Sequence, residues 1–442
     1  MALMSRKIEQ ILGTLGLMYF LGIVYLARSY DSSSSNSNKN NNKRAITSSS
    51  SELLLQPQPP LPIDKGLRIG TNNNNAAAMT TTTIQQSSGR KKLFAPDNED
   101  WEKRCALLFF GLPRSYKDMV LPSLEQFVLN YNAKYNCDVF VHYFHQRKEA
   151  AGRYNEGGEL DPTEVLTLER AVHAMFQRTH PLRKQPPTQN IFKERKSPPI
   201  VKFIHDTNKT FYKKRGEILK HYHNSKDKEG NPLFFPWKNK TWKKSSLDNV
   251  VRQWHSIQAV FELMDEYSRT NHVNYTRVGM LRNDVMFLAP VDILRLDNGT
   301  MDTENNQMVV CPFGRYPVCD RMIYGPYLGV KIWATYRFQL IEERVKSNLD
   351  PGYGMHSERF LNDSIIPYIE ENFGYHKHIN YDICFVRTRP DTVALVDDCI
   401  IKGSSRGWDE INRTEAIEKV LGYKCDDIEV DGIASNMFYL YC

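Results

Sequence analysis

Three polar residues interrupt an otherwise apolar stretch in the second half of the chain. Residues 278–281 form an apolar run long enough for one buried strand, and Arg282-Asn283-Asp284 ends it before apolar residues resume. Charged side chains are seldom buried without a partner or a ligand, and α/β sheets bind ligands at the carboxyl ends of their strands. We therefore expect Arg282 to face a phosphate group and Asp284 to face a metal ion or a sugar hydroxyl. The alternative is a strand-end turn in which Arg282 and Asp284 pair only with each other.

A glycine-containing loop follows the first apolar run of the folded part. Residues 106–110 predict a strand, and Gly111-Leu112-Pro113-Arg114-Ser115 comes directly after it. Apolar residues then recur at helical spacing between positions 121 and 128. This order predicts a strand, a loop and a helix, with the loop placed to meet a ligand.

Two carboxylates later in the chain are candidates for acid–base chemistry. Asp320 lies in a dense cluster of charged and aromatic residues at 315–325, and Glu358 lies in the first turn of a predicted helix. A carboxylate in the first turn is also stabilised by the helix dipole without any function. Glu358 therefore has a purely structural explanation as well.

The patterns that must position these residues alternate between strand and helix. Residues 138–144 predict a second strand about 30 residues after the first, which is the spacing of a βαβ unit in a parallel sheet. Helices are predicted near 163–175, 250–264 and 332–345, and further strands at 308–311, 385–389 and 392–396. We therefore predict an α/β fold with a mainly parallel sheet flanked by helices.

Two smaller features carry weaker expectations. His142 and His145 lie three residues apart and are interpreted as strand-end residues rather than metal ligands. The apolar residues at 203–204 and 233–237 are interpreted as lining a substrate groove, with packing in the core as the alternative for the second segment.

The first hundred residues differ from the rest. Residues 11–27 are uncharged and largely apolar, and at 1.5 Å per residue they span roughly 25 Å, within the range of one transmembrane helix. A cleaved signal peptide is the alternative. Residues 28–100 are rich in Ser, Asn and Thr without apolar periodicity, which predicts a disordered stem. We expect a short cytoplasmic tail at 1–10, a membrane anchor at 11–27, the stem at 28–100 and a folded luminal domain at 101–442.

The cysteines indicate an oxidising compartment. All eight lie beyond residue 100 and none forms a C-x-x-C pair, which argues against a zinc ribbon or a thioredoxin-type site. An even number within the folded part suits disulfides. Cys311 with Cys319, or Cys425 with Cys442, can each close a local loop, but the sequence does not assign the full pairing. Glycosylation sequons point to the same compartment and occur at Asn208, Asn239, Asn274, Asn298, Asn362 and Asn412.

The charge of the chain excludes one class of partner. A formal charge of +7 is mild for 442 residues, and no stripe of basic residues is interleaved with aromatic ones, so we expect no nucleic-acid partner. The excess suits an anionic ligand, although a solvated basic face is the commoner explanation.

The order of these motifs resembles a family of glycosyltransferases of surface-polysaccharide synthesis with a GT-A-like, Rossmann-type nucleotide-sugar fold. Members of that family have a Gly-x-Pro-Arg loop, a strand of the DVFIH type, a Trp-x-Ser helix and a strand ending in Arg-x-Arg-x-Asp. The corresponding residues here are 111–114, 138–142, 254–256 and 282–284, followed by 320–325 and 357–358. The first arginine of Arg-x-Arg-x-Asp is Met280 here, so another cation must take its place if that arginine grips the diphosphate.

The resemblance implies a type II membrane protein of the Golgi or endoplasmic reticulum with a luminal catalytic domain. Such an enzyme moves a sugar from a nucleotide-sugar donor to a glycan or glycoprotein acceptor. Negative charge develops on the departing diphosphate, and a carboxylate is needed near the acceptor hydroxyl, so Asp320 or Glu358 is expected to act as general base. Asp284 would hold Mn²⁺ or Mg²⁺ if a metal is used. The residues expected to bind the donor are Gly111, Pro113, Arg114, Arg282, Asp284 and Trp254.

Two other readings of the sequence stay open. Gly-x-Pro-Arg-Ser also resembles the phosphate-binding loop of Golgi sulfotransferases, which normally continues with Gly-Thr. Here Tyr116-Lys117 occupy those places, and a tyrosine ring would obstruct close approach of the backbone. The loss of an arginine at Met280 also suits a non-catalytic, lectin-like luminal protein with a degenerate transferase fold.

Overall fold

The structure is a computed structural model, which describes residues 101–149, 157–179, 197–238, 243–314, 317–348, 350–395, 399, 410–428 and 439–442. The expected cytoplasmic tail at 1–10, the anchor at 11–27 and the stem at 28–100 lie outside the described residues. Within the described residues, no helix combines the length and the apolar character needed to cross a bilayer.

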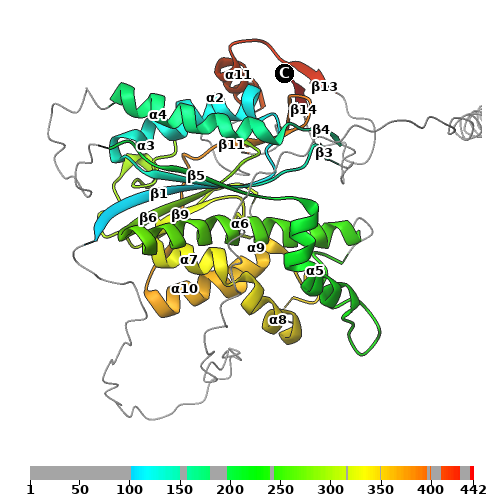
Figure 1. Ribbon diagram of the computed structural model, residues 1–442. Helices are drawn as coiled ribbons and strands as arrows, with labels where there is room; N and C mark the ends of the chain where they lie inside the picture. Colours follow the sequence, from blue (N-terminus) through cyan, green and yellow to red (C-terminus); the bar gives the residue numbers. More distant parts are fainter. Residues whose placement is uncertain are drawn as a thin grey trace, which may run out of the picture. The chain divides into compact units, whose positions relative to one another are not determined.

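A seven-stranded sheet forms the centre of the domain, in the order β10-β8-β9-β6-β1-β2-β5 (Figure 1). Four neighbouring strands, β6, β1, β2 and β5, are parallel to one another, whereas β9 runs antiparallel to both β6 and β8. The prediction of an α/β fold with a mainly parallel sheet is therefore confirmed. The strands are β1 (Glu102–Gly111), β2 (Asp138–Phe144), β5 (Val201–Asp206), β6 (Val273–Arg282), β8 (Gln307–Val310), β9 (Ile323–Pro326) and β10 (His376–Ile379).

Helices cover both faces of this sheet (Figure 1). One face carries α4 (Thr167–Thr179) and a continuous helical segment at 116–135, in which α-helical turns alternate with π and 3₁₀ turns. The other face carries α6 (Lys244–Asn271), α7 (Tyr327–Thr335) and the short helices that follow. Because both faces are covered, every position of β2 is buried, which explains its uninterrupted apolar character.

The remaining helices are η4 (Pro162–Leu166), α5 (Asn208–Asn224), α8 (Arg337–Ser347), α9 (Ser357–Phe360), η7 (Leu361–Ile365), α10 (Ile366–Phe373) and α11 (Glu410–Leu421). Of these, α5 and α8 to α10 lie near α6 and α7, whereas η4 and α11 lie near the helical segment at 116–135 (Figure 1). The predicted single helix at 332–345 is two helices, which meet at Tyr336. By contrast, the predicted apolar face at 250–264 is confirmed, because Trp254, Ile257 and Phe261 of α6 are buried.

A second, antiparallel sheet was not expected from the sequence. Its order is β13-β14-β12-β11-β7, and its strands are β7 (Val285–Phe287), β11 (Phe385–Arg389), β12 (Val393–Leu395), β13 (Asp426–Ile428) and β14 (Tyr439–Tyr441). β6 ends at Arg282 and β7 begins at Val285. The polar triplet at 282–284 is therefore the point at which the chain passes from one sheet to the other.

All eight cysteines pair in this structure. The two local pairs, Cys311–Cys319 and Cys425–Cys442, are confirmed. Cys105–Cys137 links the start of β1 to the start of β2, and Cys384–Cys399 closes a loop beside β11. Four disulfides suit a protein that folds in the secretory pathway.

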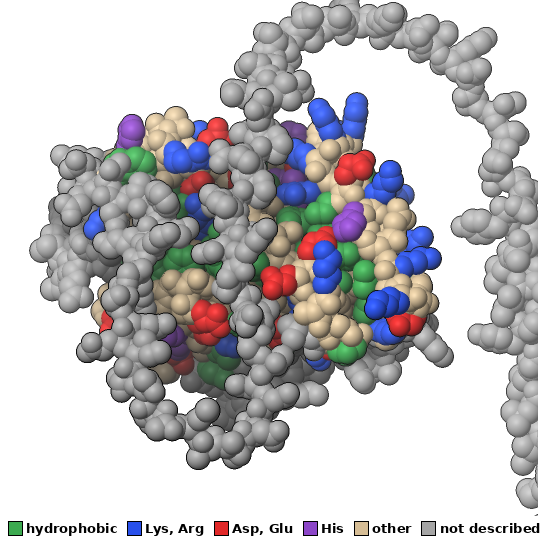
Figure 2. All heavy atoms as spheres, turned by 90° about the horizontal axis from the view of Figure 1, so that it is seen from below, with side chains coloured by type: hydrophobic (Ala, Val, Ile, Leu, Met, Phe, Trp, Pro, Cys, Tyr) green, Lys and Arg blue, Asp and Glu red, His purple; other side chains and the backbone are tan. Residues whose placement is uncertain are grey.

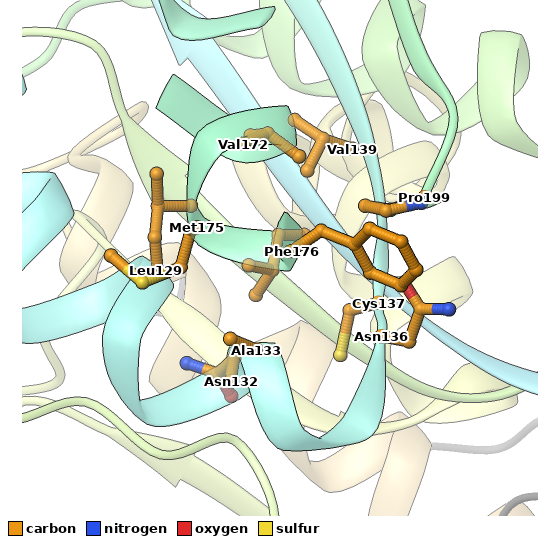
Figure 3. Close-up of a pocket in the computed structure, with 11 residues that line it drawn as sticks. Leu129, Asn132, Ala133, Asn136, Cys137, Val139, Val172, Met175, Phe176 and Pro199 are labelled. Atoms are coloured by element: carbon orange, nitrogen blue, oxygen red, sulfur yellow. The ribbon is translucent and has the colours of Figure 1, made fainter. Parts of the chain in front are cut away.

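Two apolar features pack the domain rather than form its site. In the segment predicted as a groove, Phe234 is buried and its ring stacks on Tyr222 at a centroid distance of 4.3 Å, so packing is the correct alternative there. A cavity of about 30 Å³ lies between β1, β2, α4 and the helical segment at 116–135 (Figure 3). No charged side chain lines it, so it is a packing defect and not the site expected from the sequence.

Candidate functional site

Asp284 is buried and is surrounded by arginines. Its side chain is 1 % exposed. Oδ1 accepts a hydrogen bond from Nε of Arg282 at 2.7 Å, and Oδ2 accepts from Nη2 of Arg282 at 2.8 Å and from Nη1 of Arg114. Burial alone would raise the pKa of Asp284, but the charges of Arg282, Arg114 and Arg389 hold it well below its usual range. The carboxyl group is therefore ionised at any physiological pH.

Arg114 joins the first loop to this turn. Besides its bond to Asp284, its Nε donates to Glu149 at 2.6 Å. β3 (Lys148–Glu149) carries this glutamate and pairs with β4 (Gly158–Glu159). We define the arginine cluster as Arg114, Arg282 and Arg389 with Asp284 and Glu149. In it Arg282 pairs with Asp284, as the alternative reading of this turn expected, but Asp284 also interacts with arginines from two further parts of the chain.

The end of β11 holds the loop that carries Arg114. Thr388 donates its backbone N–H to the carbonyl of Asp284 at 2.9 Å and its hydroxyl to the carbonyl of Arg114, also at 2.9 Å. Ser115 donates its hydroxyl to the carbonyl of Arg389 at 2.6 Å. The first loop, the 282–284 turn and β11 are therefore one hydrogen-bonded unit at the carboxyl ends of β1 and β6.

The backbone at Gly111 explains the need for glycine. Its φ is +108°, a region that side-chain-bearing residues rarely adopt. Its N–H donates to the hydroxyl of Ser256 at 2.8 Å, and its carbonyl accepts from Nδ2 of Asn283 at 3.3 Å. Pro113, two residues later, is buried. Gly111 and Pro113 therefore shape the loop, and Arg114 is the residue of the motif that supplies charge.

Asp320 and Glu358, far apart in sequence, form a carboxylate pair. Glu358 is largely buried in the first turn of α9, and Asp320 is 7 % exposed. Burial and the negative charge of Asp320 raise the pKa of Glu358 to about 8. Asp320 accepts a hydrogen bond from Nε2 of Gln253 in α6 at 3.1 Å. At neutral pH Glu358 therefore keeps its proton.

A buried arginine lies behind the carboxylate pair. Arg337 is fully buried, its guanidinium is 4.2 Å from the ring centroid of Trp333, and its Nε donates to the carbonyl of Trp333. Burial lowers its pKa to about 10, and the charges of Asp320 and Glu358 oppose that shift. Arg337 is therefore still charged at neutral pH, and it lies close enough to both carboxyl groups for their charges to act on it.

Trp254 supports this arrangement from inside the domain. It is fully buried, and its indole Nε1 donates to the hydroxyl of Ser357 at 3.3 Å. Ser357 precedes Glu358 at the start of α9. The structure therefore puts Trp254 behind the carboxylate pair, where it holds the start of α9, and not at a surface that a donor would contact.

The arginine cluster and the carboxylate pair meet along β11. Arg387 and Arg389 are two residues apart and thus project from the same face of the strand. The positive charge of Arg389 helps to lower the pKa of Asp284. The charges of Arg387 and Arg321 oppose the rise in the pKa of Glu358. Residues 385–389 were predicted only as a late strand. The two arginines at strand spacing near its end are the feature of the sequence that could have identified them.

The site does not suit a metal ion at Asp284. Divalent cations such as Mg²⁺ and Mn²⁺ need several oxygen ligands. Both oxygens of Asp284 already accept hydrogen bonds from arginine side chains, so a cation there would meet positive charge. Asp284 instead orients Arg114 and Arg282.

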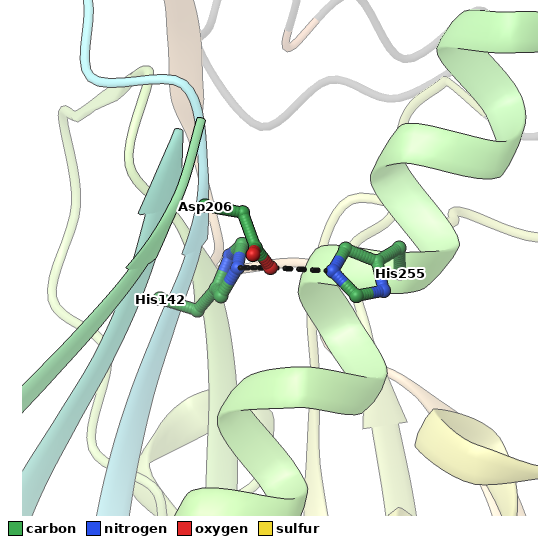
Figure 4. Close-up of side chains that lie close together, drawn as sticks. All are labelled: His142, Asp206 and His255. Carbon is green, nitrogen blue, oxygen red and sulfur yellow. Dashed lines mark hydrogen bonds and ion pairs between the residues drawn. The ribbon is translucent and has the colours of Figure 1, made fainter. Parts of the chain in front are cut away.

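A further buried cluster was not identified from the sequence. His142 in β2, Asp206 at the end of β5 and His255 in α6 lie together beneath the first loop (Figure 4). Nε2 of His255 is 2.7 Å and Nε2 of His142 is 3.2 Å from the same oxygen of Asp206. His142 therefore turns into the domain, although the sequence was interpreted as giving it a simple strand-end position.

A basic surface lies along α5 (Figure 2). Figure 2 shows lysine and arginine side chains along the edge of the molecule on which α5 lies in Figure 1. α5 carries the exposed lysines Lys209, Lys213 and Lys220, with Glu217 among them. Scattered acids and the exposure of these lysines fit a solvated face better than a binding site.

No protein family, curated protein or solved structure matches this chain. The structure brings the predicted residues Gly111, Arg114, Arg282 and Asp284 into one group, and Asp320 and Glu358 into a second group beside it. Any functional assignment therefore depends on the chemistry of these two groups.

Proposed function

We propose that this protein is a glycosyltransferase with a GT-A-like fold, which moves a sugar from a nucleotide-sugar donor to a glycan or glycoprotein acceptor. The observation that carries the proposal is the position of the carboxylate pair beside the arginine cluster, at the carboxyl ends of parallel strands. Sugar transfer needs positive charge at the departing diphosphate and a carboxylate at the attacking hydroxyl, and it needs them close together.

In this proposal the arginine cluster binds the donor diphosphate. Three arginines face two carboxylates, Asp284 and Glu149, so the cluster keeps a net positive charge. Met280 is fully buried in β6, and Arg389 from β11 takes the place of the cation that the sequence motif lacks there. Asp284 binds no metal in this scheme, since it orients the arginines.

The carboxylate pair then activates the acceptor. Asp320 takes the proton from the acceptor hydroxyl as its oxygen forms a bond to the anomeric carbon. The bond from that carbon to the diphosphate oxygen breaks, and its electron pair leaves with the diphosphate. Glu358 keeps its own proton and limits the negative charge of the pair, so Asp320 is the base. This assignment predicts inversion at the anomeric carbon.

The cellular setting is part of the proposal. The four disulfides support a luminal domain. Residues 11–27 would anchor the chain in the Golgi or endoplasmic reticulum membrane as a type II protein, and residues 28–100 would form the stem. The partners are the nucleotide sugar, the glycan acceptor and the membrane.

A sulfotransferase is the second candidate. The objection to it was that Tyr116 would obstruct the loop, but its side chain is fully buried and points away from the loop surface. The ring of Tyr116 therefore does not obstruct the approach of a phosphate of a sulfate donor to Arg114 and the loop.

Transfer assays on the full chain in detergent separate these possibilities. Nucleotide sugars and a radiolabelled sulfate donor are supplied in parallel with a mixed glycan acceptor. Turnover of a nucleotide sugar that is lost in Asp320→Asn, with the melting temperature kept, supports the proposal. Sulfate transfer supports the second candidate, and glycan binding without any turnover supports a lectin.

A further inference from the structure

The His142–Asp206–His255 cluster has the residue types of a zinc site, but its hydrogen bonds argue otherwise. Nε of Arg215 donates to Nδ1 of His255 at 3.1 Å. Arginine is always a donor, so Nδ1 must accept and the proton of His255 lies on Nε2, facing Asp206. A metal on Nε2 would move that proton to Nδ1, where it would oppose the arginine N–H.

Asp206 is also occupied by cations and donors. Nζ of Lys214 lies 2.9 Å from Oδ1 and 3.0 Å from Oδ2 of Asp206. Burial lowers the pKa of His142 and lowers that of His255 to about 4, so both rings are neutral. Each neutral ring then donates its Nε2–H to the carboxylate, and the acceptor capacity of Asp206 is filled.

One branch of this network leads to the first loop. Because Nε2 of His142 donates to Asp206, its Nδ1 is an acceptor, and it lies 2.6 Å from the hydroxyl of Ser256. Ser256 donates to that nitrogen and in turn accepts the N–H of Gly111 at 2.8 Å. The chain of donors is therefore continuous from Gly111 to Asp206; its first step is half-buried and the two that follow are buried. His255 belongs to the other branch. It meets this chain at Asp206, the end far from Gly111, and its ring lies edge-on to that of His142 at a centroid distance of 5.6 Å, but it makes no hydrogen bond to Ser256 or Gly111.

We propose that Ser256, His142 and Asp206 are positioning residues that hold the turn at Gly111, and with it Arg114, in the conformation that binds the donor diphosphate. The ligand named here rests on the proposed function, whereas the control of the turn does not. The backbone of Gly111 lies at φ +108°, outside the β region of the strand that it ends. A hydrogen bond to its N–H therefore helps to fix this turn in one conformation. The network fixes the start of the loop, and β11 fixes its end through Ser115 and Thr388.

Hydrogen exchange on the full chain in detergent tests the proposal. The Gly111 amide is expected to be protected in the unmodified protein. Ser256→Ala removes its acceptor and is expected to speed its exchange by about tenfold, the effect of losing one buried hydrogen bond. Ser256→Thr keeps the hydroxyl and is expected to restore protection. His142→Phe cuts the chain one step further on and is expected to speed exchange as well.

His255→Gln is the matched control. It disturbs the same cluster from the other branch, so it is expected to lower the melting temperature while leaving exchange at Gly111 unchanged. Equal acceleration in His255→Gln and Ser256→Ala would show that the network is merely structural. Two further results would overturn the proposal even if Ser256→Ala does not fold. One is rapid exchange of the Gly111 amide in the unmodified chain. The other is one equivalent of zinc that copurifies with the unmodified chain and is lost in His255→Gln.

Binding of nucleoside diphosphates completes the test. Uridine, guanosine and cytidine diphosphates are titrated calorimetrically into each variant, and the one that binds is expected to bind about tenfold more weakly to Ser256→Ala than to His255→Gln. If exchange follows the prediction but no nucleoside diphosphate binds the unmodified chain, the proposed function fails and the positioning role stands. If exchange is unchanged, the positioning role fails whatever binds.

Discussion

Glu358 keeps its proton at neutral pH because it is buried beside the carboxyl group of Asp320. Burial and the charge of Asp320 raise the pKa of Glu358 to about 8, and the two residues are brought together by α9 and the loop that follows the Cys311–Cys319 disulfide. In the proposed mechanism Glu358 holds a proton and Asp320 acts as the base.

Substituting Asp320 should lower turnover more than substituting Glu358. Asp320→Asn removes the base and is expected to lower turnover by about 10²- to 10⁴-fold, the usual contribution of general base catalysis. Glu358→Gln mimics the protonated acid and is expected to lower it much less. Steady-state rates with a saturating donor make the comparison, and equal losses in both variants would contradict the division of roles.

The raised pKa of Glu358 also predicts how stability changes with pH. The folded protein keeps this proton between the ordinary carboxyl pKa of 4.5 and about 8, whereas the unfolded chain loses it. Folding therefore binds a proton in this window, and the contribution of Glu358 to stability is complete below 4.5 and is lost as the pH rises through 8. Urea unfolding at several pH values should show a flatter profile for Glu358→Gln than for the unmodified chain.

Asp284 should matter more for stability than an exposed carboxylate. Asp284→Asn removes a buried charge that pairs with two half-buried arginines, and breaking such a pair costs on the order of 3 kcal/mol. Asp118, which is exposed, is the control, and Asp118→Asn is expected to change the free energy of unfolding by less than about 0.5 kcal/mol. Urea unfolding of both variants measures the difference.

The occupation of Asp284 by arginines predicts transfer that is independent of metal. Donor turnover is expected to be unchanged after dialysis against EDTA and not to rise when Mn²⁺ or Mg²⁺ is restored. Loss of turnover in EDTA with recovery in Mn²⁺ would place the metal elsewhere or show that the arginines release Asp284 when donor binds.

Arg389 should bind donor through its charge. Arg389→Met is expected to raise KM for the donor by about tenfold, the loss of one charge-assisted hydrogen bond, with a smaller effect on kcat. Lys213→Met removes an exposed charge on α5 and is expected to leave both constants unchanged. Initial rates over a range of donor concentrations separate the two constants.

The disulfide before Asp320 should affect both stability and turnover. Replacing Cys311 and Cys319 by Ser opens a loop that ends at the base, and is expected to cost roughly 3 kcal/mol and to lower turnover. Replacing Cys425 and Cys442 by Ser opens a loop at the far end of the second sheet, and is expected to cost similar stability without loss of turnover at a temperature where both variants are folded.

The sequence predicted the parts of the fold that depend on local patterns. The spacing of residues 106–110 and 138–144 predicted parallel strands, and the apolar face around Trp254 predicted α6. The strands of the second sheet are three to five residues long, too short to show a period, and their pairing joins distant parts of the chain. Two of its strands, at 385–389 and 392–396, were predicted, but their assembly into a separate antiparallel sheet was not.

The candidate site was predictable to the same extent. Charged residues that interrupt apolar runs, such as Arg114 and Asp284, stand out in the sequence. Asp206 and His255 do not, because an acid or a histidine next to a helix or strand is usually solvated. Their contact exists only because β5 and α6 meet in space. The importance of Arg387 and Arg389 likewise follows from pairing of β11 with β7.

One turn of α6 sets the spacing of the whole site. Gln253, Trp254, His255 and Ser256 are consecutive, and they contact, in order, Asp320, Ser357, Asp206 and Gly111. One residue inserted before this turn would rotate it by about 100° and misdirect all four contacts together. The first loop and Asp320 therefore keep a fixed spacing, and any change in what the proposed site binds must arise in the loops around this helix and not in the helix itself.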